Sequence, residues 1–167
     1  MATRARIGIK QKSGRIIASY QHWDGYPGGL GYKLEEYWTD KSKVTKAIKL
    51  GDASTWGMFI GDKIDFDDRT ADTYDYQNVY YGRDRGEKNC GYKIYKDEAE
   101  YLADGFNSGE DYIYLMKDVG DKDYLGKPTG TWFYAKYDNC VSFEKNLKVA
   151  VKDHIDILTR SCLKEVA

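Results

Sequence analysis

Cysteine and histidine are both scarce in this chain of 167 residues. The three cysteines, Cys90, Cys140 and Cys162, are odd in number and widely spaced, which suits neither a disulfide framework nor a zinc site. The two histidines, His22 and His154, are too few for a histidine-rich metal centre. We therefore expect reduced thiols, no metal ion and no other cofactor.

Long apolar runs are also missing, since no stretch approaches the ~20 apolar residues of a membrane-spanning helix. Residues 1–4 carry a charge but no apolar segment of a secretory signal. A net charge of −1 argues against broad nucleic-acid binding driven by phosphate neutralisation, although it leaves room for a local basic site. The composition, 41% hydrophobic and 32% charged, predicts one soluble domain over residues 1–167 with no membrane partner.

Alternating apolar residues near the N-terminus predict a β-hairpin, with strands at 5–11 and 16–23 and a short glycine turn between them. If Ser13 and Gly14 form a two-residue turn, one face of the hairpin carries a row of polar and aromatic side chains. The residues on that face are Arg4, Arg6, Ser19, Gln21 and Trp23. The opposite face, which carries Ile7 and Ile9, then packs on the core.

Hydrophobic periodicity predicts the remaining elements. Strands are expected at 78–83, 110–117 and 131–137, and helices at 30–38, 41–50, 97–104 and from near Ser142 to the C-terminus. Residues 52–77 have no clear period and are rich in aspartate, so we expect an irregular, solvated insertion there. The fold class expected is α+β, with a mostly antiparallel sheet of four to five strands packed with two to three helices.

The stretch QHWDGYPGGLG, residues 21–31, concentrates four glycines ahead of a predicted helix. Glycines in such a place let backbone N–H groups approach an anion such as a phosphate. The alternative is a turn whose glycines adopt positive φ, with Trp23 and Tyr26 packed over it. The sequence leaves both interpretations open.

Two arginines, Arg83 and Arg85, share one face if the strand beginning at residue 78 continues through them. Such a pair forms a fork for carboxylate or phosphate, or else a charged hairpin end with surface ion pairs. Together with the arginines of the N-terminal strand, they predict a basic, aromatic-edged pocket for a small anionic, nucleotide-like ligand. The residues expected to line it are Arg4, Arg6, Gln21, Trp23, Asp24, Tyr26, Arg83, Arg85 and Glu87.

Catalysis is the less favoured interpretation. His22, Asp24 and Glu87 are of the types that general acid–base catalysis uses. The sequence contains no recognisable Ser-His-Asp order and no metal-ligand spacing, however. The predicted register also places His22 on the core side with Tyr20. We expect a binding protein, with these three residues as the catalytic candidates if the protein is an enzyme.

Four motifs carry a resemblance to known proteins: RARIGI (4–9), HWDGYPGGLG (22–31), LGDAS (50–54) and YYGRDRGE (80–87). In these motifs the chain resembles a family of small, largely uncharacterised proteins of T4-like tailed bacteriophages. The resemblance covers the first half of the chain and implies an accessory protein in the cytoplasm of an infected bacterium. It carries no catalytic residue with it.

Proteins in that setting often blunt host defence, and one class sequesters nucleotide-derived immune signals. By analogy with sponges against CBASS- or Thoeris-type immunity, the sequence predicts binding of a cyclic oligonucleotide or cyclic ADP-ribose type of signal without cleavage. Arginines would hold the phosphates, and Trp23 and Tyr26 would wall the base. The alternatives are a nucleotide-acting hydrolase and a protein-binding inhibitor that docks through the acidic residues 62–75. The C-terminal helix could also form a homo-oligomer.

Overall fold

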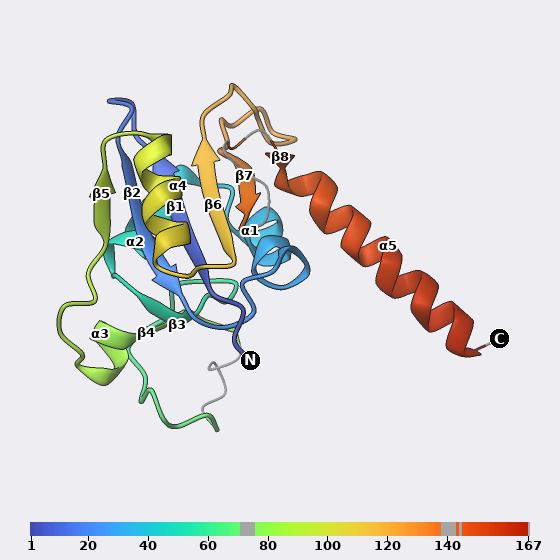
Figure 1. The fold of residues 1–167 in the computed structure, drawn as a ribbon, viewed down its shortest axis with the longest axis horizontal. Helices are drawn as coiled ribbons and strands as arrows, with labels where there is room; N and C mark the ends of the chain where they lie inside the picture. The colour runs from blue at the N-terminus through green and yellow to red at the C-terminus, as the bar shows by residue number, and fades with distance from the viewer. Residues whose placement is uncertain (71–75, 138–142, 144, 167) are drawn as a thin grey trace.

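A central β-sheet with helices on both faces makes up the molecule (Figure 1). The computed structural model describes residues 1–70, 76–137, 143 and 145–166, with side chains through residue 156 apart from that of 145. The strands are β1 (Ala5–Lys10), β2 (Ile16–Gln21), β3 (Ala53–Thr55), β4 (Val79–Tyr80), β5 (Lys93–Tyr95), β6 (Tyr112–Lys117), β7 (Thr131–Lys136) and β8 (Lys145–Asn146). The helices are the π-helix η1 (Pro27–Gly31), α1 (Tyr32–Tyr37), α2 (Lys41–Lys49), α3 (Tyr81–Arg85), α4 (Glu98–Asn107) and α5 (Leu147–Val166).

The strand order is β4-β3-β2-β1-β6-β7-β8, and β5 also pairs with β2. Most neighbouring strands are antiparallel, while β1 with β6 and β2 with β3 are parallel. The α+β class with a mostly antiparallel sheet is therefore confirmed. The described residues form eight strands and five α-helices, more of each than expected, because several elements are only two to six residues long.

The sheet is buried on both faces, so the hydrophobic core has two parts. On one face, Ile7 of β1 packs with Leu34 of α1 and Val44 of α2. On the other face, which Figure 1 views from the front, Ile16 of β2 packs with Leu102 of α4. The strand predicted at 110–117 is confirmed as β6, and its side chains alternate between the two parts of the core. Tyr114 and Met116 belong to the first part, and Ile113 and Leu115 to the second.

The register of the β1–β2 hairpin differs by one residue from the prediction. Arg6 lies opposite Tyr20 and not opposite Gln21, and Ala5 takes the place opposite Gln21. The cause is the turn, in which Gly14 N–H donates to the Gln11 carbonyl and Gly14 adopts φ 87°. This is a type I turn followed by a glycine bulge, which adds a residue to the loop. Gln21 consequently shares the face of Ile7, while Arg6 lies on the face that α4 covers.

The predicted strand at 78–83 is wrong beyond Tyr80. Only Val79 and Tyr80 pair as β4, and the chain then turns into the short helix α3, which contains both Arg83 and Arg85. Gly86 ends this helix in the left-handed conformation, at φ 73°. The arginines therefore do not form the two-residue fork of an extended strand.

Residues 52–77 are more ordered than the expected solvated insertion. They contain β3, whose Ala53 and Ser54 are buried, and the wholly buried Trp56. Phe59 and Gln77 form a parallel bridge that closes this segment on itself. Residues 71–75 lie outside the described part of the chain, and with them two of the six aspartates of the acidic stretch. The prediction, which was based on the many aspartates of this segment, missed the buried residues at its start.

The glycine-rich stretch is packed closely on its neighbours. A Cβ on Gly25 would lie 2.6 Å from the Thr3 carbonyl oxygen, and a Cβ on Gly28 would lie 2.0 Å from Cδ2 of His154 on α5. The Tyr26 and His154 rings also meet, with centroids 5.9 Å apart. His154 is thus a packing residue, and the stretch serves as the platform on which α5 rests. This observation favours the scaffold interpretation of residues 21–31.

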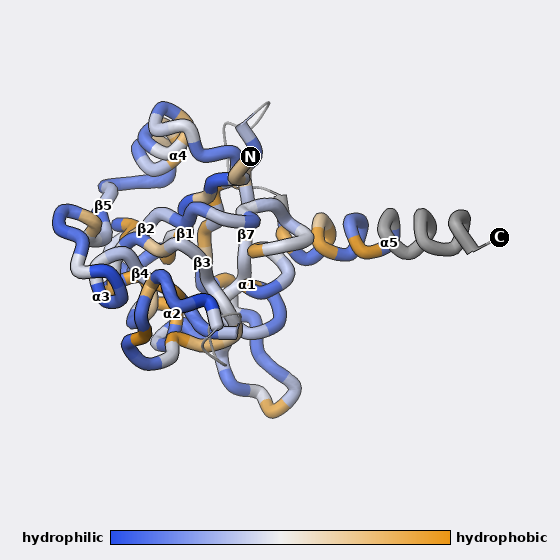
Figure 2. Tube along the Cα trace, turned by 90° about the horizontal axis from the view of Figure 1, so that it is seen from below, coloured by the Kyte–Doolittle hydropathy of each residue, from blue (hydrophilic) through white to orange (hydrophobic). Residues whose placement is uncertain are grey.

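Helix α5 is seated only by its first turns and then projects from the body (Figures 1 and 2). Leu147 and Val151 are buried at its seated end. It begins at Leu147 and not near Ser142, which lies outside the described residues. Within the described part of the chain, neither α5 nor any other helix is long and apolar enough to cross a membrane.

Replacement of Gly28 by alanine tests this platform. The new methyl group would overlap the His154 ring, so we expect Gly28→Ala to lower the unfolding free energy by about 1–3 kcal/mol. In a His154→Ala background the same replacement should cost much less, because the overlapping ring is gone. Thermal melts of the four proteins of this double-mutant cycle measure the effect. Gly91→Ala, which meets no atom within 4 Å, is the control, and an additive cycle would contradict the contact.

Glu35 of α1 gives the stability a predictable pH dependence. Burial raises the pKa of its carboxyl from 4.5 to about 6, against the opposing charge of Lys148. The folded state therefore binds a proton more tightly than the unfolded state, and stability is lost as pH rises from about 4.5 through about 6. Glu35→Gln should abolish this loss and stabilise the protein at pH 7 by about 1 kcal/mol, allowing for solvent screening. Melts from pH 4 to 8 test it, with the exposed Glu36→Gln as a control that should leave the pH profile unchanged.

Candidate functional site

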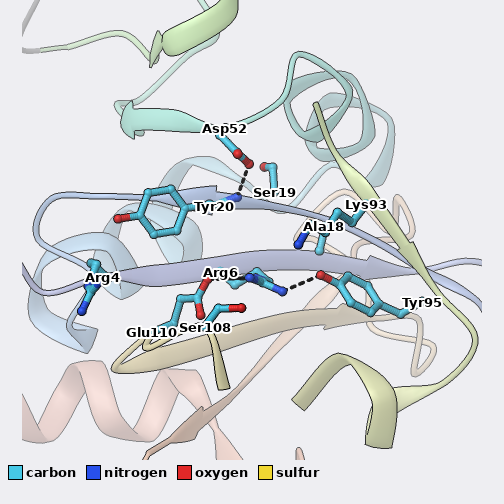
Figure 3. A pocket seen from close by; sticks show the side chains of 10 residues that line it. All are labelled: Arg4, Arg6, Ala18, Ser19, Tyr20, Asp52, Lys93, Tyr95, Ser108 and Glu110. Carbon is cyan, nitrogen blue, oxygen red and sulfur yellow. Dashed lines mark hydrogen bonds and ion pairs between the residues drawn. The ribbon is translucent and has the colours of Figure 1, made fainter. Parts of the chain in front are cut away.

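A cavity of about 300 Å³ opens on the α4 side of the sheet (Figure 3). It lies where β1, β2 and β5 meet the residues just before β3 and β6. Its lining residues are Arg4, Arg6, Ala18, Ser19, Tyr20, Asp52, Lys93, Tyr95, Ser108 and Glu110. Charged groups of both signs and two tyrosines thus surround one small space.

The Arg6 guanidinium occupies the inner wall, and its side chain is only 6% exposed. Its Nε and Nη2 donate to Glu110 Oε1, at 3.1 and 2.6 Å. Its Nη1 donates to the Tyr95 hydroxyl at 2.5 Å and to the Asp104 carboxylate of α4. A buried cation needs such partners, because an unpaired charge in the interior costs several kcal/mol. Arg6 is therefore fixed in place by three other elements of the fold.

One buried polar atom on the Arg6 side of the lining, Glu110 Oε2, has no hydrogen-bond partner among the described residues. Glu110 is only 3% exposed. Ser19 Oγ is also without a described partner, but Ser19 lies opposite Ile7 and so on the other face of the sheet from Arg6. Burial raises the pKa of the Glu110 carboxyl, against the favourable charge of Arg6. A buried polar atom without a partner is destabilising, typically by about 1–3 kcal/mol. The free oxygen of Glu110 is unmet bonding capacity that a bound ligand can satisfy.

Asp52 and Tyr20 form the opposite wall. The Tyr20 backbone N–H donates to Asp52 Oδ1 at 2.9 Å, yet burial still raises the pKa of the Asp52 carboxyl. Burial also raises the pKa of the Tyr20 phenol to about 12, so the hydroxyl keeps its proton at neutral pH. The Tyr20 oxygen lies 2.7 Å from Nδ1 of His22. His22 thus reaches this wall only through Tyr20.

Exposed cations stand at the rim of the cavity. Lys93 is 62% exposed along its side chain and lies 3.6 Å from Asp104. Arg4 is exposed, and in the described residues no carboxylate is within ion-pair distance of its guanidinium. Arg4 is therefore free to meet an anionic group at the mouth, and Lys93 adds an exposed ammonium beside Asp104, a role that the buried Arg6 cannot take.

Of the predicted binding residues, only Arg4 and Arg6 line this cavity. Gln21 lies on the other side of the sheet, where its side-chain amide donates to the Trp23 carbonyl and accepts from the backbone N–H of Trp56. Trp23 is 42% exposed, with its ring edge-on to His22. The expected grouping of these residues on one face does not form, because the register is shifted by one residue.

Asp24 and Tyr26 take structural positions. Asp24 adopts φ 55°, and its carbonyl accepts from the Leu30 N–H at 2.8 Å, which closes the glycine-rich turn. Tyr26 packs on His154 and lines a different hollow, of about 540 Å³, next to the N-terminal residues. Arg4 lines both hollows and so links the hollow beside Tyr26 to the cavity.

Arg83 is occupied by the protein itself. All five of its N–H groups donate: to both oxygens of Asp84 and to the carbonyls of Ile60, Gly61 and Asn78. Arg85 is 49% exposed and pairs with Glu87 at 3.3 Å. The structure therefore places Arg83 as a clamp that holds residues 60, 61 and 78 to α3, and leaves Arg85 and Glu87 as a surface pair.

The residues that sequence reasoning missed are Ser19, Tyr20, Asp52, Lys93, Tyr95 and Glu110. One signal was present, because Asp52 lies in the LGDAS motif. Glu110 gave a weaker one, as a carboxylate at the start of an otherwise apolar strand. Neither pattern indicates that the two side chains meet at one cavity.

The described residues contain no group of three or more histidine, cysteine, aspartate or glutamate side chains placed to hold a metal ion. Cys90 is a free, half-buried thiol whose pKa burial raises. Cys140 and the side chain of Cys162 lie outside the described part of the chain.

Arg83 and Arg85 should differ sharply on replacement. Arg83→Ala leaves Asp84 and three carbonyls without their donor, so we expect a loss of about 2–4 kcal/mol in unfolding free energy. Arg83→Lys should not rescue it, since an ammonium cannot reproduce the five-donor fork. Arg85→Ala, the matched exposed control, should change stability by less than about 0.5 kcal/mol. Urea unfolding of the three variants decides the matter, and equal effects at both positions would refute the assigned role.

Known proteins supply no assignment for this cavity. No protein-family model, no curated protein and no solved structure matches the chain. The resemblance to phage proteins therefore stays a prediction, and what bears on function is the geometry of the cavity.

Proposed function

We propose that the protein binds a small, anionic, nucleotide-like ligand in the cavity between β1, β2, β5 and the residues just before β6, Ser108 and Glu110. The observation that carries the proposal is the partnerless buried oxygen Glu110 Oε2 in the lining of a cavity with cations at its rim. A carboxylate oxygen accepts from hydroxyl or amino groups. Sugar hydroxyls and base amino groups are ligand groups of this kind.

The rim of the cavity suits the anionic end of such a ligand. Arg4 and Lys93 are exposed cations at the mouth, while Arg6 is already bound to Glu110 and Asp104. A phosphate at the rim would meet these two exposed cations, with the polar body of the ligand directed inward. Tyr20 and Tyr95 add aromatic surface to the walls.

The size of the cavity limits the ligand. A volume of about 300 Å³ is at the lower end of small-molecule sites, so one nucleoside-phosphate unit fills it. A larger cyclic oligonucleotide would extend beyond the mouth. Sequestration of a nucleotide-derived immune signal, of the cyclic oligonucleotide or cyclic ADP-ribose type, is the function we infer within a phage-infected bacterium.

A hydrolase is the second candidate, and one observation favours it. Asp52 and Glu110 both have carboxyl groups whose pKa values burial raises, and both line the cavity. Carboxyl groups tuned in this way are typical of general acid–base catalysis. The acid–base candidates thus move from His22, Asp24 and Glu87 to Asp52 and Glu110.

Mass spectrometry distinguishes the two functions. The purified protein is incubated with cyclic dinucleotides, cyclic trinucleotides and cyclic ADP-ribose isomers, and the free ligand is measured before and after heat denaturation. Sequestration predicts depletion of one compound and its unchanged return on heating. A new product mass would establish the hydrolase instead, and turnover should then be lost in Asp52→Asn.

Paired variants locate the site. Arg4→Gln with Lys93→Gln should weaken binding of the depleted compound roughly tenfold or more, because two charge-assisted contacts are lost. Arg85→Gln with Lys88→Gln removes the same charge elsewhere and should leave binding unchanged. Equal affinity of the two double variants, or a panel that stays free throughout, would overturn the proposed site.

A further inference from the structure

A second hollow lies at the other end of the β1–β2 hairpin, and lysine dominates its lining. It has a volume of about 640 Å³ and is formed by the end of β1 with its turn, by α2, and by the end of β6 with the following loop. Six lysines line it: Lys10, Lys12, Lys41, Lys46, Lys49 and Lys117. We call this hollow the lysine groove.

Positive charge is concentrated around this groove. Its six lysines are accompanied by Asp118 in the lining and by Glu98, which pairs with Lys10 and Lys117 at 3.0 Å. The surroundings of the groove therefore carry a charge of +4, while the whole chain carries −1 and the remainder −5. A net charge close to zero thus conceals a concentrated basic surface.

Three of these lysines have no acidic partner among the described residues. Lys41 pairs with Asp118, and Lys10 and Lys117 with Glu98. Lys12, Lys46 and Lys49 are exposed and form no ion pair with any described carboxylate. Like charges held together without counter-charges repel one another, so an anion that fills the groove is stabilised there.

The lysines of α2 have one purely structural explanation, which is incomplete. Lys46 and Lys49 lie in the last turn of α2, where cations interact favourably with the helix dipole. That effect does not account for Lys12 in the hairpin turn or for Lys117 at the end of β6. Three separate segments bring lysines to one hollow, which points to a shared ligand.

We propose that the lysine groove binds the phosphodiester backbone of nucleic acid without reading its sequence. Protein–nucleic acid interfaces are strongly basic, and lysine binds phosphate as a point charge. Protein–protein interfaces, in contrast, are depleted in lysine and depend on aromatic anchors, and the groove lining contains no aromatic side chain. Without aromatic groups to stack on bases, binding rests on phosphate contacts alone.

Fluorescence anisotropy with a labelled 20-base-pair DNA duplex, and with one strand of it, tests the proposal. For the duplex, the three unpaired lysines predict that the logarithm of the association constant falls with the logarithm of the salt concentration at a slope of about −3. Affinity should then drop roughly 40-fold between 50 and 200 mM salt. Lys46→Gln with Lys49→Gln should reduce the slope to about −1 and weaken binding roughly tenfold or more at low salt. The duplex and single-strand arms identify which form is preferred.

The control variant is Lys63→Gln with Lys88→Gln, which removes the same charge. Lys63 adjoins Ile64, whose N–H binds Asp84 of α3, and Lys88 follows α3 by three residues. Helix α3 lies at the bottom of Figure 1, far from the β1–β2 turn at the top. This variant should bind as the native chain does. Absence of binding at 50 mM salt, equal effects of the two variants, or equally tight binding of a poly-glutamate peptide would each overturn the proposal.

Discussion

The buried guanidinium of Arg6 is the interaction on which the cavity side of the structure depends. It joins β1 to the start of β6 through Glu110, to β5 through Tyr95 and to α4 through Asp104. Both of the Arg6 bonds to Glu110 go to Oε1, so Oε2 of this buried carboxylate is left without a partner. Burial raises the pKa of Glu110, against the opposing effect of the Arg6 charge. The Glu110 carboxylate thus holds Arg6 with one oxygen and offers the other oxygen to the proposed ligand.

Two arginines, Arg83 and Arg6, bind other parts of the protein and are not available to a ligand. Arg83 uses its whole donor set on Asp84 and three carbonyls, and so ties residues 60, 61 and 78 to α3. Arg6 does the same for the sheet and α4. The cations left exposed near the cavity are Arg4 and Lys93, and those near the groove are lysines. Around the cavity and the groove, the cations that an anionic ligand can meet are therefore exposed ammonium groups and the guanidinium of Arg4.

The cavity and the lysine groove lie at opposite ends of the same hairpin and suit different ligands. The cavity is small, carries both signs of charge and contains a partnerless buried carboxylate oxygen, which favours a compact ligand with hydroxyl or amino groups. The groove is larger, basic and without aromatic side chains, which favours an extended polyanion. Because α2 and α4 cover opposite faces of the sheet, the two sites are separated by the hydrophobic core.

Sequence by itself determined the elements whose signal is local. The apolar spacing of α2 with its Asp40 cap, the alternation along β6 and the α+β class were all predictable, because each depends on residues a few positions apart. Tertiary structure decided the rest. A single glycine bulge at Gly14 shifted the hairpin register and moved Gln21 to the opposite face from Arg6. Arg6 and Glu110 are 104 residues apart, and their contact follows from the parallel pairing of β1 with β6, which no local pattern encodes.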